Sequence, residues 1–194
     1  SIDATKHQVI YEDNTITVES LPLKHRMPCC GFLFHEKPKK RHLIGDVVNF
    51  YNIPAYMRQA IKDGADYTTP EGVTIHNSRL TKDADPSRSY AYCSDTAPFP
   101  ELARWIKGVN LLYHEATFPS SMGEMAEKTF HSTTLQAAQT AADANVGHLV
   151  VGHYSSRFPS VDFYLDELKT IFPATSLAHD GAVFEIPLVK LNDK

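Results

Sequence analysis

Short runs of alternating apolar and polar residues predict a series of strands and helices along most of the chain. In the first third, residues 9–11 and 15–21 have the two-residue period of strands, and residues 31–34 form another short apolar run. From residue 89 onward the two element types alternate, with strands predicted at 90–93, 109–113, 149–151, 175–178 and 182–189 and helices at 100–107, 132–145 and 161–171. This alternation predicts an α/β fold with a largely parallel sheet.

The middle of the chain does not follow this pattern. Residues 37–88 contain four prolines, many charged side chains and only a weak helical pattern at 54–62. Prolines and charges at this density interrupt both strand and helix periodicity. We therefore expect residues 35–88 to form an arm-like insertion that leaves the core of the domain.

The composition predicts a single globular domain, and its mild negative charge does not indicate nucleic-acid binding. The 194 residues are 42% hydrophobic, which is enough for one sizeable core, and the formal net charge is −4. A local basic patch could still bind RNA, and the longest candidate is the run KPKKR at 37–41. Taken alone, this run is more typical of a solvated loop.

Cysteine usage and the chain ends indicate the compartment. The chain has an odd number of cysteines, of which Cys29 and Cys30 are adjacent, so no disulfide framework is expected. This pattern fits a reducing, cytoplasmic setting, and no apolar run reaches membrane length. The first residue is Ser1 rather than Met, so we expect a processed or truncated piece of a longer protein.

Polar side chains with metal-binding or catalytic potential follow four of the predicted strands. These side chains are Asp95, His114, Glu115, His153, His179 and Asp180. The carboxyl ends of parallel strands meet at one edge of a sheet, which is where ligands bind in open α/β folds. Each of these residues could be a structural polar group, but the group as a whole favours a divalent metal such as zinc or manganese.

His131 has a different position, directly before the predicted helix 132–145, for which Ser132 is the expected cap. Free N–H groups at the start of a helix attract anions such as phosphate. A histidine there could donate a proton to a leaving oxygen, although it could also be an exposed residue with no such role.

Four motifs in fixed order resemble ribonuclease Z, a family of tRNA 3′-processing endonucleases with the metallo-β-lactamase fold. The motifs are YCSDTAP (92–98), HEATF (114–118), HST (131–133) and GHYSSRF (152–158), preceded by LKHRMPCCGFLF (23–34). The resemblance extends over nearly the whole chain. It implies the carboxyl-terminal half of an αββα sandwich of the metallo-β-lactamase type, residues 1–194 being part of one such domain.

The resemblance also implies roles for individual residues. His25 and His153 correspond to histidine ligands of two different zinc ions, and Asp95 to the carboxylate that bridges them. His131 corresponds to the histidine that protonates the 3′ leaving oxygen, and Glu115 to the carboxylate that orients it. Further residues correspond to phosphate or RNA contacts, namely Ser155, Arg157, Lys37, Lys39, Lys40 and Arg41.

Two departures from the family pattern limit this expectation. The motif H-x-H-x-D-H, which supplies most of the metal ligands in the family, is absent from the 194 residues. In the arm, the family's Gly-Pro pair is missing after Ile53-Pro54. We therefore expect zinc, or manganese in its place, to bind this chain partially or not at all, and the chain to be inactive alone.

The predicted function is that of a zinc-dependent endoribonuclease which removes the 3′ trailer from tRNA precursors, with precursor tRNA as partner and a homodimer as assembly. Two alternatives remain: another phosphodiesterase of the same fold, and a non-catalytic RNA-binding or dimerisation fragment. The second alternative gains weight because the H-x-H-x-D-H motif is absent.

Overall fold

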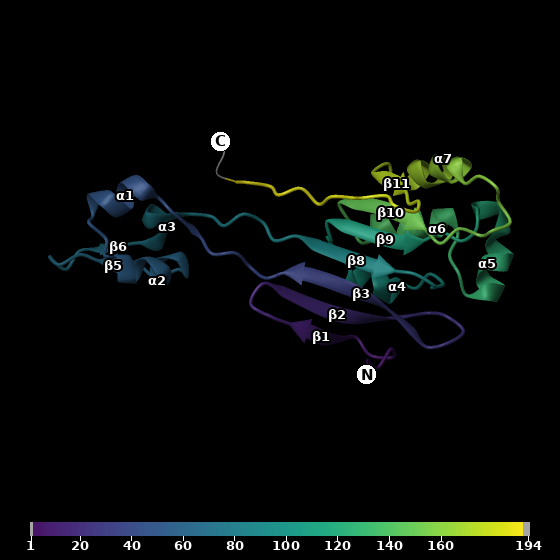
Figure 1. Cartoon of the computed structure of the whole chain (residues 1–194), viewed down its shortest axis with the longest axis horizontal. Helices are drawn as coiled ribbons and strands as arrows, with labels where there is room; N and C mark the ends of the chain where they lie inside the picture. Colours follow the sequence, from purple (N-terminus) through teal and green to yellow (C-terminus); the bar gives the residue numbers. More distant parts are fainter. Residues whose placement is uncertain (1, 192–194) are drawn as a thin grey trace. The chain divides into compact units, whose positions relative to one another are not determined.

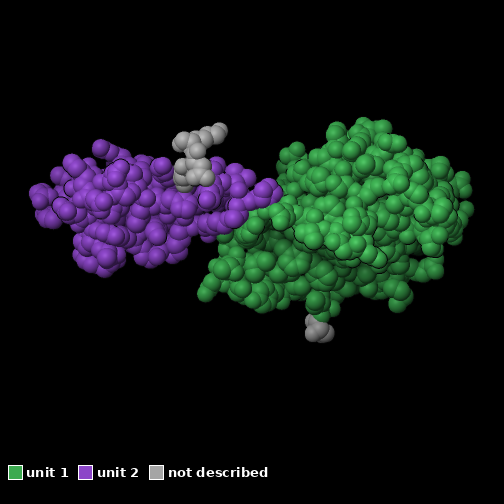
Figure 2. Space-filling model, turned by 45° about the horizontal axis from the view of Figure 1, so that its top comes forward, with its two compact units in different colours: residues 1–37, 88–186 green, residues 38–87, 187–194 purple. Residues whose placement is uncertain are grey.

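The computed structural model describes residues 2–191 and divides the chain into two compact units, which Figure 2 shows in different colours. Unit 1 comprises the residues up to Lys37 together with Arg88–Ile186. Unit 2 comprises Pro38–Ser87 and the stretch that begins at Pro187. The breaks near residues 37 and 88 lie where the apolar alternation of the sequence stops and where it resumes.

Unit 1 is built on a seven-stranded sheet with the order β1-β2-β3-β8-β9-β10-β11. Its antiparallel part consists of β1 (Gln8–Glu12), β2 (Ile16–Leu23) and β3 (Cys29–Glu36). Strand β8 pairs antiparallel with β3 and starts the parallel part, which consists of β8 (Ser89–Cys93), β9 (Leu111–Glu115), β10 (His148–Gly152) and β11 (Thr175–Leu177). Short turns can join antiparallel strands, whereas parallel strands need crossover connections.

Helices in these crossovers cover one face of the sheet (Figure 1). They are α4 (Pro100–Trp105), α6 (Thr134–Asp143) and α7 (Asp162–Ile171). The crossover after β9 also contains the 3-10 turn η2 (Ser120–Met122) and α5 (Gly123–Thr129), which precede α6. Helix α6 packs against β9 and β10, and its alanines join Leu112 and Leu149 in the main hydrophobic core. Small side chains on α6 let the helix lie close to the sheet.

The opposite side of the sheet carries a row of aromatic residues, which we call the aromatic face and define by Phe34, Tyr90, Tyr92 and Tyr113. Phe34 stacks on Tyr90 with ring centroids 5.7 Å apart, and Tyr92 stacks on Tyr113 at 4.8 Å. Each stacked pair consists of cross-strand neighbours, as the register of β3 with β8 and of β8 with β9 requires. Tyr92 is 37% exposed.

Unit 2 has a small core of its own. Its helices are α1 (Gly45–Phe50), the 3-10 turn η1 (Ala55–Met57), α2 (Arg58–Lys62) and α3 (Asn77–Leu80). Its strands form two short antiparallel pairs, β4 (His42–Leu43) with β7 (Thr81–Lys82) and β5 (Tyr67–Thr68) with β6 (Thr74–Ile75). The buried side chains that hold these elements together are Val48, Ile53, Ile61, Tyr67, Ile75 and Leu80.

Two local predictions were wrong. Residues 182–189 form no strand, because a strand needs a hydrogen-bonded neighbour as well as an alternating sequence. The cap of α6 is Thr133 rather than Ser132: Thr133 and Gln136 form a reciprocal capping box, while the Ser132 hydroxyl donates to the carbonyl of Thr96. Within residues 2–191, no helix is long and apolar enough to cross a membrane.

Candidate functional site

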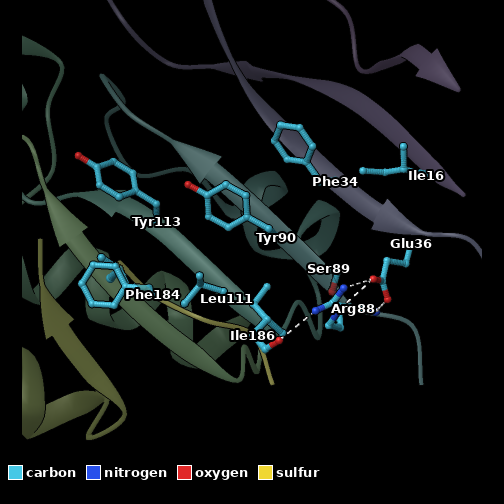
Figure 3. Close-up of a pocket in the computed structure, with 11 residues that line it drawn as sticks. Ile16, Phe34, Glu36, Arg88, Ser89, Tyr90, Leu111, Tyr113, Phe184 and Ile186 are labelled. Carbon is cyan, nitrogen blue, oxygen red and sulfur yellow. Dashed lines mark hydrogen bonds and ion pairs between the residues drawn. The ribbon is translucent and has the colours of Figure 1, made fainter. Parts of the chain in front are cut away.

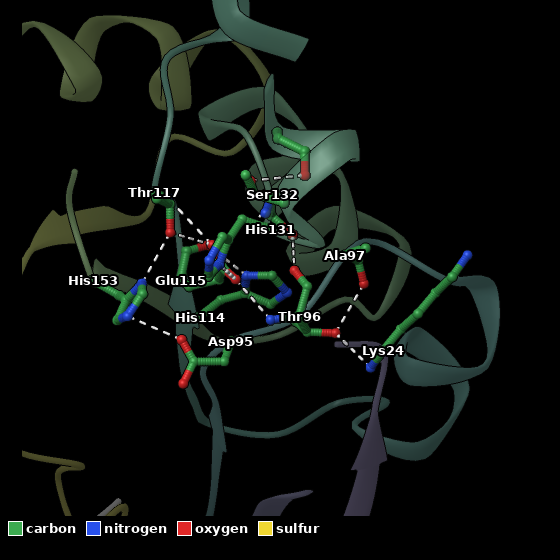
Figure 4. Close-up of polar contacts among 12 residues, drawn as sticks. Lys24, Asp95, Thr96, Ala97, His114, Glu115, Thr117, His131, Ser132 and His153 are labelled. Atoms are coloured by element: carbon green, nitrogen blue, oxygen red, sulfur yellow. Dashed lines mark hydrogen bonds and ion pairs between the residues drawn. The ribbon is translucent and has the colours of Figure 1, made fainter. Parts of the chain in front are cut away.

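Side chains from four separate segments meet at the carboxyl ends of the parallel strands (Figure 4). Ligand atoms of Asp95, Glu115, His131 and His153 all lie within 4.8 Å of one another. His25, in the loop between β2 and β3, lies beside this cluster, with its ring centroid 5.1 Å from that of His131. The structure therefore brings together the five residues to which the family resemblance gave metal-binding or catalytic roles.

Two of these residues have an unusual backbone conformation. Asp95 has φ of 56° and His153 has φ of 60°, which lie in the left-handed region that costs energy for residues other than glycine. Asp95 lies two residues beyond the end of β8, and His153 directly follows the end of β10. The sharp turn of the backbone at these positions directs both side chains toward the cluster (Figure 4).

Glu115 is the buried centre of the cluster, with no exposed surface. Its Oε1 accepts hydrogen bonds from the Thr96 amide at 2.7 Å and from His131 Nδ1 at 2.7 Å. Its Oε2 accepts from the Thr117 hydroxyl at 2.5 Å, from the Thr117 amide at 3.3 Å and from the Ser132 amide at 3.1 Å. A buried carboxylate needs this number of donors to replace its lost hydration.

His131 is oriented through the nitrogen that faces Glu115. Since the carboxylate accepts a hydrogen bond, Nδ1 carries a proton, and Nε2 is the nitrogen that can contact a substrate or a metal ion. Phe130, the preceding residue, adopts the left-handed conformation with φ of 61°, and the His131 amide donates to the Ala126 carbonyl at 2.9 Å. The backbone and the carboxylate together fix the direction of the imidazole.

The tautomer of His153 follows from its neighbour Thr117. The Thr117 hydroxyl has a single proton, which it donates to Glu115, so it must accept from Nδ1–H of His153 at 2.9 Å. The other ring nitrogen, Nε2, lies 2.9 Å from Oδ1 of Asp95. Thr117 therefore holds the ring so that Nε2 of His153 and the carboxylate of Asp95 lie close enough to bind one metal ion together.

This donor set fits a borderline divalent cation such as zinc, which accepts imidazole nitrogen and carboxylate oxygen. The His153 ring has the arrangement that metal-binding histidines need, with one nitrogen held by a hydrogen bond and the other directed at a carboxylate oxygen. Sequence reasoning missed Thr117, although it lies within the motif HEATF. A hydroxyl that joins two functional side chains leaves no pattern in the sequence.

Two other titratable groups lie beside the cluster. Cys29 donates a weak hydrogen bond to the Asp95 carbonyl, with its sulfur 3.5 Å from the oxygen, and burial followed by the charge of Asp95 raises the pKa of the thiol. His114 is fully buried, its Nδ1 donates to the Glu115 carbonyl at 2.7 Å, and burial lowers the pKa of its imidazole. Within the described residues, Nε2 of His114 has no hydrogen-bond partner.

Ser155 and Arg157 lie in the loop after β10, shortly after His153, and Ser155 contacts Thr117. The Ser155 amide donates to the Thr117 carbonyl at 3.0 Å, and an Arg157 guanidinium nitrogen lies 3.4 Å from the Ser155 hydroxyl. The guanidinium also lies over the ring of Phe118, 5.8 Å from its centre. His179 and Asp180, which follow β11, are not among the four residues of the cluster.

The basic residues at 37–41 each have a partner on the protein. Lys37 pairs with Glu12 within unit 1. In unit 2, Lys40 pairs with Asp63 at 2.9 Å, and Arg41 pairs with Asp83 at 2.6 Å. Nζ of Lys39 donates to the carbonyl of Pro86 at 3.3 Å. These contacts reduce the positive charge that the run presents to a ligand.

Known proteins with similar sequences include several named "Ribonuclease Z". The chain is 49% identical over 179 residues to "Ribonuclease Z" from Bacteroides fragilis, and 50% identical over 180 residues to the protein of that name from Parabacteroides distasonis. Each match covers 92% or 93% of this chain but 59% of the relative, so the chain spans about three fifths of the length of these relatives. A scan against protein-family models found no match.

Solved structures with a similar fold include a protein of the metallo-β-lactamase fold and a tRNase Z. The metallo-β-lactamase fold protein YhfI from Bacillus subtilis gives a TM-score of 0.59 at 16% identity, with 91% of this chain and 52% of that chain covered. The short form of human tRNase Z gives a TM-score of 0.56 at 19% identity, with 93% and 47% covered. This chain therefore has the metallo-β-lactamase fold and is homologous to ribonuclease Z over 92% of its own length.

Proposed function

We propose that this chain is the carboxyl-terminal part of a zinc-dependent endoribonuclease that removes the 3′ trailer from tRNA precursors. The observation that carries the proposal is the contact of Glu115 with His131, because a buried carboxylate that orients an imidazole is the arrangement of a general acid–base catalyst. Homology to ribonuclease Z supports the substrate class.

Metal binding in this proposal falls to His25, Asp95 and His153. Asp95 and His153 present an oxygen and a nitrogen 2.9 Å apart, and a carboxylate can bridge two ions. A bound zinc ion would supply an activated water and neutralise charge on the phosphate. Three protein ligands shared between two ions are fewer than catalytic zinc uses, so we expect weak or partial metal binding and no activity from this chain alone.

His131 serves as the proton donor to the 3′ oxygen of the cleaved bond. Its Nδ1 proton is held by Glu115, which leaves Nε2 to carry the proton that is transferred. Glu115 does not touch the leaving oxygen in this scheme; it fixes the direction of the His131 ring through the 2.7 Å contact with Nδ1. Glu115 is therefore a positioning residue.

Residues outside the cluster would contact the phosphates of the RNA substrate. Ser155 and Arg157 offer a hydroxyl and a guanidinium near the metal ligands, which suits a phosphate group. The basic residues Lys37, Lys39, Lys40 and Arg41 would contact RNA by exchanging their present partners for phosphates. Homodimer formation and a cytoplasmic location are further parts of the proposal.

A chimeric protein tests the function directly. In it, this chain replaces the matched 179 residues of the Bacteroides fragilis relative. We expect the chimera to cleave precursor tRNA after the discriminator nucleotide, and His131→Ala to lower the rate constant about 10²–10⁴-fold because proton donation is lost. A chimera that folds and binds zinc without cutting precursor tRNA would refute the proposal.

Two controls separate catalysis from stability. His179→Ala removes a histidine outside the cluster and should leave the rate unchanged. Zinc measured by mass spectrometry on this chain alone should be substoichiometric and should fall further in Asp95→Asn. Two tightly bound zinc ions per chain with turnover would contradict the incomplete site.

A further inference from the structure

The segment that carries His131 is a loop whose two ends meet. We call residues 118–134 the histidine loop: it begins after β9, runs through η2 and α5, and ends at the start of α6. Phe118 and Thr133 form an isolated parallel bridge, and the Thr134 amide donates to the Phe118 carbonyl at 2.9 Å. His131 lies within three residues of this junction, so the junction sets where its backbone lies.

Glu167 on α7 joins the two ends of the histidine loop. Its Oε2 accepts from the Ser120 amide at 2.9 Å and from the Thr134 hydroxyl, and its Oε1 accepts from the Ser120 hydroxyl at 2.9 Å. Ser120 is the first residue of η2 and follows Pro119, which supplies no side-chain cap, so the Glu167 carboxylate takes that place. Thr134 is the first residue of α6, where the helix dipole stabilises a negative charge.

The charge and the position of Glu167 are both held by its surroundings. Burial alone would raise the pKa of Glu167, but hydrogen bonds from Thr134 and Ser120 outweigh it and lower the pKa below its usual value. The next residue, Leu168, is fully buried in the main core, which anchors the helix. Helix α7 packs against α6, on the side of the sheet opposite the aromatic face that Figure 3 shows in close-up.

The same face of α7 also contacts the residue just before the histidine loop. Tyr164 lies three residues before Glu167, and residues at this spacing share one face of a helix. Tyr164 is fully buried, and its hydroxyl donates to the Thr117 carbonyl at 3.1 Å. Thr117 in turn contacts Glu115 and His153. One helix face therefore supports the main chain beneath the cluster at two points.

We propose that Glu167 is a positioning residue for proton transfer, because it closes the base of the histidine loop and thereby fixes the backbone of His131. The hydrogen bond from Nδ1 to Glu115 sets the direction of the ring, but Nε2 reaches the right place only if the backbone also stays fixed. Misplacement of a catalytic group by about 1 Å can cost about 10²-fold in rate. The proton transfer rests on the proposed function, whereas the effect of Glu167 on the imidazole does not.

The first test observes the imidazole in this full chain by NMR. The signal is the Nδ1 proton of His131, which Glu115 accepts, and its loss in His131→Ala identifies it. We expect Glu167→Ala to shift or broaden this signal, since the base of the histidine loop loses its acceptor, and Glu167→Gln to retain it. Glutamine keeps one oxygen for the Ser120 amide and the Thr134 hydroxyl, and the Ser120 hydroxyl can turn to accept from the glutamine amide.

Two matched variants on α7 separate positioning from stability. Asp166→Asn neutralises the neighbouring exposed carboxylate, and Leu168→Val removes one methylene group from the core. Both should leave the Nδ1 signal in place, although Leu168→Val lowers the free energy of unfolding. An unchanged signal in Glu167→Ala, or an equal change in Leu168→Val, would overturn the proposal. If Glu167→Ala does not fold, Thr134→Val, which removes one donor to the same carboxylate and keeps the side-chain shape, decides by the same signal.

The second test measures catalysis in the chimera with the Bacteroides fragilis relative. We expect Glu167→Ala to lower kcat about 10–10²-fold and to leave KM unchanged, because a displaced proton donor weakens only the transition state. Glu167→Gln should restore most of the rate, and Asp166→Asn should have no effect. A change confined to KM, or an equal loss of kcat in Leu168→Val, would overturn the positioning role.

The outcomes also separate this proposal from the proposed function. A chimera that does not cleave precursor tRNA, together with a Nδ1 signal that Glu167→Ala shifts, would support the positioning of His131 and refute the nuclease assignment. A chimera that cleaves precursor tRNA equally well with Glu167→Ala would support the nuclease assignment and refute the positioning role.

Discussion

The two units use the same kinds of charged side chain in opposite surroundings. In unit 1, Glu115 is fully buried, accepts hydrogen bonds from main-chain and side-chain donors, and faces His131. In unit 2, Arg41 pairs with Asp83 at 2.6 Å, but their side chains are 33% and 73% exposed. Water and salt screen the second pair and scarcely reach the first.

This difference in burial determines which of the two contacts holds its side chains in a fixed position. A buried carboxylate that loses its donors has no water to replace them, so every group around Glu115 is held in one place. An exposed pair exchanges its partner for water, or for a phosphate, at little cost. Fixed geometry suits proton transfer, and exchangeable pairs suit contacts with an RNA backbone.

Removal of the buried carboxylate should have the largest effect. Glu115→Ala leaves His131 and the buried amides of Thr96 and Ser132 without an acceptor, so we expect a loss of about 3–5 kcal/mol in the free energy of unfolding. Urea denaturation followed by Trp105 fluorescence measures the loss. The matched control Glu124→Ala removes an exposed glutamate, and equal losses in the two variants would contradict the comparison.

Removal of the Thr117 hydroxyl, which lies between Glu115 and His153, should have the second-largest effect. Thr117→Val keeps the shape but removes the donor to Glu115 and the acceptor for His153, at an expected cost of about 1–3 kcal/mol. Nitrogen NMR should also show that His153 no longer prefers the Nδ1-protonated form. Thr117→Ser retains the hydroxyl and should restore both properties; an unchanged tautomer in the valine variant would refute the role of Thr117.

The sequence predicted the residues of the site better than the residues that orient them. Asp95, Glu115 and His153 follow parallel strands, and strand ends on one edge must converge, so their proximity was predictable. Thr117 was missed because its role depends on contacts between segments far apart in sequence.

The strand predicted at 182–189 was wrong for a related reason. The alternation of apolar residues is present and the chain is extended along Ala182–Ile186, but a strand also requires a neighbour. Sequence patterns record which side of a segment is buried. They do not record whether another main chain lies beside it.

A pH titration probes the burial of His114, whose effect on the pKa outweighs the opposing influence of Glu115. Burial lowers the pKa of His114 below its usual 6.5, so the unfolded chain takes up a proton at a higher pH than the folded one. The free energy of unfolding contributed by neutral His114 is therefore complete above pH 6.5 and declines as pH falls below it. Comparing urea unfolding at pH 7.5 and 5.5, we expect His114→Leu to reduce the pH dependence.

His179→Leu is the control for this titration, because His179 is an exposed histidine and its removal should leave the pH dependence as it is. The informative quantity is the difference in pH dependence between each variant and the parent. An identical pH dependence in parent and His114→Leu would show that the buried imidazole is not the source.

The smallest effect is expected at the exposed pair of unit 2. Arg41→Gln removes the contact with Asp83 and weakens that with Thr81, but both Arg41 and Asp83 remain in reach of water, so unfolding should change by at most about 1 kcal/mol. The same variant in the chimera should weaken binding of precursor tRNA and reduce its salt dependence, since one phosphate contact is lost. A large loss of stability with unchanged RNA affinity would mean that Arg41 is structural, and that exposure alone does not separate the two kinds of charged pair.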